Sequence, residues 1–421
     1  MRHILVVLLL ALGAGEARTQ GLVEEVHRLP DLSRRALAGA IRRILEKKGA
    51  TLDALVQACR AFPFKGKLVP GLHPVPPGTL VISKGLEPGT RGPLLVVIPA
   101  TGQSDKEAAR FWAEKIRFPA LILAPKPAVP GRAWTFSKED REVILEAHRW
   151  ALAHLPVDPD RVFLAGYSRG GHGAWGIALR HPDPFAAVIA VAGGPRLAWT
   201  QDQNNIRFLK NLAGTPLLAM VGGKDDPYLV WNVREACARL KSWGSPVTLI
   251  LKESEGHALF VEGREISKWL EGKKRPSSPK KVFLACSGPA RRAWISVSRL
   301  DRRFTAPLRP AFRASFWRSL TKEQQRKRIV DFSLAHTAWI AGEIPGPGMV
   351  RISAEGVRRF RLLAGPDNPL GDAKGNLLVQ VGRKKPVRRR LHPSRQVLLR
   401  EWAKNPDPSR LVWAHLDMSA R

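Results

Sequence analysis

Apolar and polar positions change their spacing twice along the chain, and each change marks a different kind of predicted element. Between residues 31 and 62, apolar side chains recur at intervals of three or four residues, and Gly49 interrupts the series. This spacing places them on one face of a helix. It predicts a helical hairpin within an N-terminal segment that covers residues 18–76.

Between residues 77 and 271, short and nearly unbroken apolar runs alternate with stretches of helical length. Strands buried on both faces of a parallel sheet have continuous apolar runs, and repeated alternation of strand and helix is typical of a doubly wound fold. The sequence therefore predicts an α/β domain with a mostly parallel sheet over 77–271. Its expected strands are residues 94–98, 120–123, 162–165, 187–191, 217–221 and 247–251, and its expected helices are residues 137–154, 171–181, 228–242 and 258–271.

A polar, proline-containing break at residues 272–281 ends this pattern. Beyond it, residues 282–421 contain short alternating segments that are separated by turn signals such as Gly346-Pro347-Gly348. Several short strands with regular turn signals are typical of a β-sandwich. We therefore predict a linker over 272–281 and a second, smaller all-β, sandwich-like domain over 282–421.

The first 17 residues have the parts of an export signal. A basic start is followed by an apolar run from Ile4 to Leu12 and by a region of small residues. The apolar run is too short to span a bilayer. We expect a signal peptide over 1–17, no transmembrane segment, and a mature protein that is secreted or periplasmic.

The three cysteines, Cys59, Cys237 and Cys286, lie far apart in the sequence and form no Cys-x-x-Cys pair. We interpret them as small buried hydrophobic residues. The sequence predicts neither a metal site nor a cofactor.

Ser168 lies where a strand is expected to turn into a helix. The run Gly166-Tyr-Ser168-Arg-Gly170 follows the apolar run at 162–165 and precedes the helical stretch at 171–181. Glycines permit a sharp turn here, and the first amides of the helix face an anion that forms at the serine. A Gly-x-Ser-x-Gly match is weak evidence by itself, but in this context it predicts that Ser168 is a nucleophile.

A serine nucleophile needs a base that takes its proton and an acid that orients the base. In this strand order both partners follow later strands, the acid before the histidine. Asp225 and Asp226 come just after 217–221, and His257 comes just after 247–251. We predict His257 as the base and Asp225 as the acid. Asp226 remains open as the acid, because either aspartate suits the cap of a helix that starts at Pro227.

Two backbone N–H groups are expected to bind the oxyanion. One is the amide of Arg169, and the other comes from Thr101 or Gly102, in the loop after the first core strand. Trp134 is expected near the mouth of the site, where it would shape a substrate pocket. Ordinary loop packing is the alternative role for Trp134.

The formal net charge of +33 lies mainly in the C-terminal third, where residues 273–421 hold 33 Lys and Arg against 10 Asp and Glu. Such an excess suits an anionic polymer or surface as a partner. The charges are scattered among apolar residues, so we expect no specific nucleic acid, and a general bias toward arginine is the alternative. We predict a loop for the densest cluster, at 383–390.

The run from Asp160 to Trp175, with His181-Pro182-Asp183 and Gly193-Gly194, resembles secreted esterases of the polyhydroxybutyrate-depolymerase, feruloyl-esterase and phospholipase/carboxylesterase type. These belong to the α/β-hydrolase superfamily, and the resemblance covers residues 79–271. Many relatives carry His-Gly after the first core strand, whereas this chain has Pro99-Ala100-Thr101-Gly102.

The resemblance implies the α/β-hydrolase fold and hydrolysis of carboxylic esters through an acyl-enzyme intermediate. The implied triad is Ser168, His257 and Asp225, and the implied substrate is an ester, either free or linked to a polymer. Two other functions remain open. A serine peptidase of the prolyl-oligopeptidase type shares the triad, and a non-catalytic protein could use the basic C-terminal region to bind an anionic polymer.

Overall fold

The computed structural model describes residues 20–61, 68–87, 89–129, 134, 137–198, 204–258, 260, 262–276, 279–305, 313–371 and 375–420. The predicted signal peptide over 1–17 lies outside the described residues. No helix in these ranges is both long and apolar enough to cross a membrane.

An eight-stranded sheet forms the centre of the molecule, with the order β1-β2-β4-β3-β5-β6-β7-β8. From β4 through β3, β5, β6 and β7 to β8, each strand runs parallel to the next. The pairs β1–β2 and β2–β4 are antiparallel. The predicted α/β-hydrolase architecture is confirmed. The strands are β1 Gly71–Val75, β2 Gly78–Ile82, β3 Gly92–Ile98, β4 Leu121–Pro125, β5 Val157–Tyr167, β6 Ala187–Val191, β7 Leu217–Gly222 and β8 Val247–Lys252.

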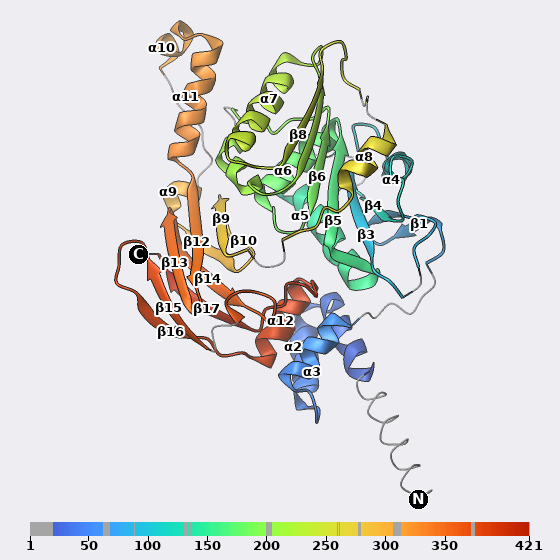
Figure 1. The fold of residues 1–421 in the computed structure, drawn as a ribbon, viewed down its shortest axis with the longest axis vertical. Coiled ribbons are helices and arrows are strands. Elements are labelled where there is room, and N and C mark those ends of the chain that lie inside the picture. Colours follow the sequence, from blue (N-terminus) through green and yellow to red (C-terminus); the bar gives the residue numbers. More distant parts are fainter. Residues whose placement is uncertain are drawn as a thin grey trace, which may run out of the picture.

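Both faces of this sheet are covered by helices, as the continuous apolar runs predict (Figure 1). Successive residues of a strand point to opposite faces. On β3, Val96 belongs to a core shared with α5, α6 and α7, and Val97 belongs to a core shared with α4 and α8. The helices are α4 Asp105–Ala113, α5 Lys138–His154, α6 Arg169–Arg180, α7 Pro227–Ser242 and α8 Gly263–Leu270.

Two features of this domain differ from the predicted pattern. Strand β1 lies within the predicted N-terminal segment of 18–76 but belongs to the sheet. It is an edge strand that contains Pro74 and has no buried position, so it lacks an apolar run. Helix α4 was not predicted either, although Ser104 and Glu107 form a capping box at its start.

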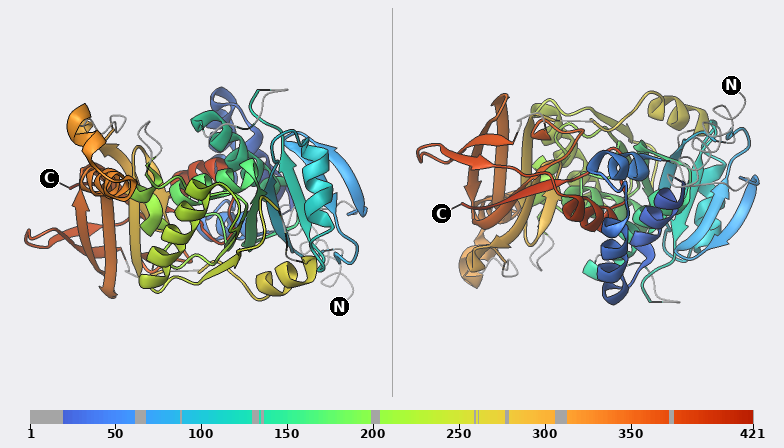
Figure 2. Two further views of the ribbon diagram at one scale, coloured as in Figure 1. Left: turned by 90° about the horizontal axis from the view of Figure 1, so that it is seen from above. Right: turned by 90° about the horizontal axis from the view of Figure 1, so that it is seen from below.

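The N-terminal helices pack mainly on the C-terminal part of the chain (Figures 1 and 2). The predicted hairpin appears as α2 Arg34–Glu46 and α3 Leu52–Arg60, after the short helix η1 Leu29–Asp31. Its core includes residues of α12, Arg395–Lys404, and the indole of Trp402 donates a hydrogen bond of 3.0 Å to Val26 O. Arg91, just before β3, donates to Arg60 O. The hairpin therefore lies at the amino ends of the parallel strands.

The C-terminal part is built around two sheets that share one apolar core, which confirms a second β domain. Their orders are β10-β11-β14-β17 and β16-β15-β13-β12-β9, and all pairs except β13–β15 are antiparallel. The strands are β9 Lys281–Cys286, β10 Ala290–Arg292, β11 Ile295–Leu300, β12 Ala338–Gly346, β13 Met349–Glu355, β14 Val357–Ala364, β15 Asn376–Val381, β16 Val387–Arg390 and β17 Ala414–Ser419.

This second part is not purely β. Between β11 and β12 it contains α9 Arg302–Thr305, α10 Ala314–Ser319 and α11 Lys322–Ala335, and α12 follows β16. The prediction of a loop over 383–390 is wrong in its second half, because Val387–Arg390 pairs with β15 as strand β16. All four residues of β16 are exposed, so no buried apolar position marked the strand.

The α/β part and the C-terminal part share a continuous interface. Ile329 and Val330 of α11 belong to the core of the large sheet. Asn211, in the helix η2 Asn205–Leu212, holds the edge strand β9 by accepting from Ala285 N at 2.7 Å and donating to Ala285 O at 2.8 Å. Arg275, within the predicted linker, is only 6% exposed. Within the polar break at 272–281, the side chain of Arg275 is therefore buried, whereas Gly272, Lys274, Pro276 and Lys280 are exposed.

The three cysteines are buried and free, as predicted. Burial raises the pKa of Cys237 and of Cys286 to about 12. Their thiols are therefore protonated at neutral pH and behave as apolar side chains.

Candidate active site

Ser168 lies in a strained turn between β5 and α6. Its backbone has φ 56° and ψ −118°, a conformation that L-residues adopt rarely. The two glycines of the motif are sterically required, because a Cβ on Gly166 would lie 2.1 Å from Gly170 O, and one on Gly170 would lie 2.1 Å from Ile98 O. The close approach of strand, turn and helix explains why both flanking positions are glycine.

His257 connects Ser168 to Asp225. Its Nε2 lies 2.8 Å from Ser168 Oγ, and its Nδ1 lies 2.8 Å from Asp225 Oδ2. These residues follow β8, β5 and β7, and the carboxyl ends of parallel strands meet at one edge of the sheet. The structure thus brings together three predicted residues that are 32 and 89 positions apart in sequence.

The geometry separates the two neighbouring aspartates. Asp226 is the N-cap of α7 and accepts a hydrogen bond of 2.8 Å from Leu229 N. Asp225 Oδ1 accepts from Asp226 N at 2.7 Å, while its Oδ2 faces His257. Only Asp225 of the pair contacts the imidazole, and its side chain is 7% exposed against 45% for His257.

Tyr167, which sequence reasoning did not single out, also contacts the histidine loop. Its hydroxyl donates a hydrogen bond of 2.9 Å to His257 O. Burial and the charge of Asp225 raise the pKa of Tyr167, so the phenol keeps its proton. The sequence signal that could have identified Tyr167 is its position directly before Ser168.

The predicted oxyanion donors lie on both sides of the nucleophile. The amide of Arg169 is the first of α6, and Thr101 and Gly102 lie in the turn after β3. Among the described residues, none accepts a hydrogen bond from the N–H of Arg169, Thr101 or Gly102. The first amide at the start of α6 is therefore available to donate a hydrogen bond to an anion.

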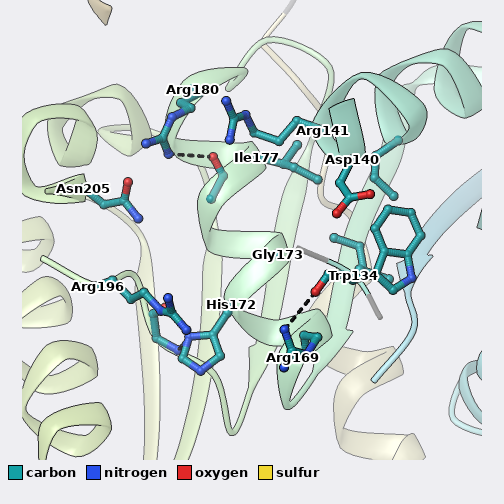
Figure 3. A pocket seen from close by; sticks show the side chains of 14 residues that line it. Trp134, Asp140, Arg141, Arg169, His172, Gly173, Ile177, Arg180, Arg196 and Asn205 are labelled. Carbon is teal, nitrogen blue, oxygen red and sulfur yellow. Dashed lines mark hydrogen bonds between the residues drawn. The ribbon is translucent and has the colours of Figure 1, made fainter. Parts of the chain in front are cut away.

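The Arg169 side chain joins the loops around the site. Its Nε donates to Thr101 Oγ1 at 3.0 Å. Its Nη1 donates to Trp134 O at 2.9 Å (Figure 3). Trp134 is 5% exposed and lines a pocket beside α6 together with His172. Burial, together with nearby cations, lowers the pKa of His172 to about 4. His172 is therefore neutral at physiological pH.

The family model described as "Putative esterase" matches residues 93–325. A curated relative, S-formylglutathione hydrolase of Rattus norvegicus, is 28% identical over 26% of this chain and 46% of its own length. The chain thus spans about half the length of that relative.

Solved structures with a similar fold include a thermostable esterase, at 20% identity and a TM-score of 0.40, over 49% of this chain and 63% of that one. An acylaminoacyl peptidase of Pyrococcus horikoshii is 16% identical with a TM-score of 0.38, over 49% of this chain and 42% of that one. Since the family model covers more than half of the sequence, the resemblance predicted from residues 79–271 is confirmed: the chain belongs to the esterase family of α/β-hydrolases.

Proposed function

We propose that this protein hydrolyses carboxylic esters, with Ser168 as nucleophile, His257 as general base and Asp225 as the acid that orients the imidazole. The observation that carries the proposal is the pair of 2.8 Å contacts that His257 makes, one from each ring nitrogen. This arrangement can move the Ser168 proton to Nε2 while Asp225 stabilises the resulting imidazolium.

In the first step, Ser168 Oγ forms a bond to the ester carbonyl carbon and its proton passes to His257 Nε2. The carbonyl oxygen becomes an oxyanion that accepts hydrogen bonds from the amide of Arg169 and that of Thr101 or Gly102. The C–O bond to the alcohol then breaks, and the alcohol leaves with the proton from His257. The product of this step is an acyl-Ser168 ester.

In the second step, a water molecule gives a proton to His257 and attacks the acyl-Ser168 carbonyl. The acyl–Oγ bond breaks, Ser168 regains the proton, and the carboxylic acid leaves. The Asp225 side chain accepts hydrogen bonds from Asp226 N and from the imidazole, and it holds the ring in place through both steps.

Covalent labelling tests the proposal directly. A fluorophosphonate is expected to label the wild-type protein, and p-nitrophenyl acetate is expected to turn over. Ser168→Ala should abolish labelling and lower kcat by about 10³-fold or more, while the circular dichroism spectrum stays the same. Ser242→Ala, at an exposed position of α7, is the matched control. A folded wild-type protein that is neither labelled nor active on esters would contradict the proposal.

A peptidase remains the second candidate, because a triad of this kind cleaves amides as well. Comparing p-nitrophenyl esters with p-nitroanilides of the same acyl group separates the two activities. We expect the esters to react faster; anilide cleavage with a comparable kcat/KM would favour the peptidase.

We also propose that the protein is exported and that its C-terminal part holds it on an anionic polymer or surface. The feature that supports binding to an anionic partner is the exposed edge strand β16 and the turn before it. None of the basic residues in this segment forms an ion pair with a described residue. These residues are Arg383, Lys384, Lys385, Arg388, Arg389 and Arg390. Replacing Arg388 and Arg390 with Ser should lower the salt concentration that elutes the protein from heparin. Unchanged elution would remove this candidate.

A further inference from the structure

The loop after β8 carries His257 and is held closely up to the residue before it. The carbonyl of Glu255 accepts a hydrogen bond of 2.8 Å from Lys224 N. Gly256 lies against the end of β7, because a Cβ on Gly222 would be 2.2 Å from Gly256 O. These contacts fix where the loop leaves the sheet, but they do not include His257 itself.

The main chain of His257 is held by Tyr167. The Tyr167 hydroxyl donates a hydrogen bond of 2.9 Å to His257 O, and no other described residue donates to this carbonyl. The two rings also contact each other, with centroids 5.7 Å apart and planes at 45°. Tyr167 therefore contacts both the main chain and the imidazole of His257.

This contact matters because the imidazole is poorly enclosed. The side chain of His257 is 45% exposed, and among the described aromatic side chains only Tyr167 contacts its ring. A general base must stay within hydrogen-bond reach of the proton that it takes. A displacement of about 1 Å can lower a rate by about 10²-fold. The 2.8 Å contact between His257 Nε2 and Ser168 Oγ therefore depends on how firmly the main chain of His257 is held.

Tyr167 is itself supported by α4. Its ring centroid lies 6.2 Å from that of Phe111, with the planes at 33°. Phe111 in turn contacts Trp112 edge to face at 5.8 Å. Trp112 is 1% exposed and belongs to the core that the sheet shares with α4 and α8. The hydroxyl of Tyr167 thus extends from a ring that packs on a buried core.

The bond to His257 O also leaves Tyr167 without a proton for the substrate. A phenol has a single proton to donate, and that of Tyr167 goes to the His257 carbonyl. Burial and the charge of Asp225 raise the pKa of Tyr167, so the phenol is not a base at neutral pH either. The arrangement suits a residue that holds His257 in place.

We propose that Tyr167 is a positioning residue: its hydroxyl holds the main chain of His257 so that Nε2 stays within reach of Ser168 Oγ. Tyr167 acts through His257 and makes no bond to the reacting atoms. This proposal rests on the ester hydrolysis proposed above. Since His257 moves protons in both steps of that reaction, loss of the hydroxyl should slow both steps.

Tyr167→Phe tests the proposal because it removes the hydroxyl and keeps the ring. We expect kcat and kcat/KM for p-nitrophenyl acetate to fall together by about tenfold, which the loss of one hydrogen bond to a peptide carbonyl allows. An equal fall in both constants is the sign of an interaction that serves the transition state. The circular dichroism spectrum should stay the same.

Tyr228→Phe is the matched control. Tyr228 also donates a hydrogen bond to a main-chain carbonyl, that of Ala198, but this carbonyl lies after β6 and not in the loop that carries His257. The same chemical change should alter kcat and kcat/KM here by less than about twofold.

The His257→Ala background shows whether Tyr167 acts through the imidazole. Residual turnover in His257→Ala no longer depends on where the imidazole lies, so adding Tyr167→Phe should not lower it further. Such non-additivity is expected of residues that act as one unit. A merely structural role, or a direct contact of Tyr167 with the substrate, would lower the activity of both backgrounds by the same factor.

Three results would overturn the proposal. They are wild-type constants in Tyr167→Phe, equal losses in Tyr167→Phe and Tyr228→Phe, and a further tenfold loss when Tyr167→Phe is added to His257→Ala. In each of these cases the wild-type protein still hydrolyses the ester. If the folded wild-type protein hydrolyses no ester, or if His257→Ala retains full activity, the ester hydrolysis proposed above is contradicted instead.

Discussion

Two clusters that pair aspartate with a basic side chain lie in different parts of this molecule, and they differ in how completely they are enclosed. At the nucleophile, Asp225 is buried but His257 is 45% exposed. Between the two parts of the chain, Arg275 and Asp407 have side chains that are only 5% and 3% exposed. In the first cluster, Nε2 of His257 faces Ser168. In the second cluster, the guanidinium of Arg275 is bonded to side chains of the protein.

The second cluster is held by many bonds. Arg275 Nη1 lies 2.9 Å from Asp407 Oδ2, and Nη2 lies 3.0 Å from Asp160 Oδ1 and 2.8 Å from Ser409 Oγ. Burial alone would raise the pKa of Asp407, but Arg275 lowers it and keeps the carboxylate ionised. In the proposed mechanism the partly exposed cluster transfers protons, whereas the closed cluster joins two parts of the structure.

Among the variants that compare the two clusters, Asp225→Asn should have the largest effect. The amide cannot stabilise an imidazolium and favours the wrong tautomer of His257, so kcat for p-nitrophenyl acetate should fall by about 10⁴-fold. The thermal unfolding midpoint should change little. Asp226→Asn is the matched control, because Asn still caps α7. A greater loss in Asp226→Asn than in Asp225→Asn would exchange the roles of the two residues.

Arg275→Ala should have the largest effect on stability. It leaves the buried carboxylate of Asp407 without its main partner, which costs about 3–5 kcal/mol of unfolding free energy. Urea unfolding followed by tryptophan fluorescence measures this loss. The control is Lys281→Ala, since the Lys281–Glu343 pair is 80% and 41% exposed and is worth at most about 1 kcal/mol. Equal losses in both variants would contradict the distinction between the clusters.

Acid should destabilise the protein through three buried or half-buried histidines, one of which lies beside the second cluster. Burial lowers the pKa of His148, His172 and His181 to about 4, whereas an unfolded histidine titrates near pH 6.5. As the pH falls through 6.5, the unfolded state takes up protons that the folded state does not. Stability is therefore complete above about pH 6.5 and declines toward pH 4.

At pH 5 each of these histidines is expected to lower the free energy of unfolding by about 2 kcal/mol relative to neutral pH. Thermal midpoints measured from pH 7.5 to pH 4.5 check this decline. His148→Gln removes one titrating group, and its midpoint should depend less steeply on pH than that of the wild-type protein. If the thermal midpoints of both proteins depended on pH with the same slope, protonation of His148 would not contribute to the loss of stability in acid.

The contrast between the clusters also explains which features could be predicted from the sequence. Ser168, Asp225 and His257 each follow an apolar strand, so the local pattern was enough to propose them and to expect them at one edge of the sheet. The hydrogen bonds of His257 then agree with that expectation. Only the choice between Asp225 and Asp226 needed coordinates, because it depends on which carboxylate reaches the imidazole.

The second cluster had no such local signal. Arg275 lies in a polar stretch that resembles a linker, and its partners come from β5 and from residue 407. Strand β16 and helix α12 were likewise missed, the first because its residues are all exposed. Arg196, which lines the pocket beside α6, has a left-handed backbone that is a property of the folded chain. Features built from distant partners or backbone strain leave little pattern in a sequence.

The smallest effect is expected from Asp226→Ala. This variant tests, by its effect on stability, whether Asp226 is the helix cap and Asp225 is the acid of the triad. The variant removes the hydrogen bond from Leu229 N and the negative charge at the start of α7. It should lower the unfolding free energy by about 1 kcal/mol and leave kcat for p-nitrophenyl acetate within about twofold of wild type, because Asp226 makes no contact with His257 among the described hydrogen bonds. Asp226→Asn should recover most of the lost stability. If Asp226→Ala lost activity in proportion to Asp225→Asn while retaining full stability, Asp226 would act on the imidazole and the cap would be incidental.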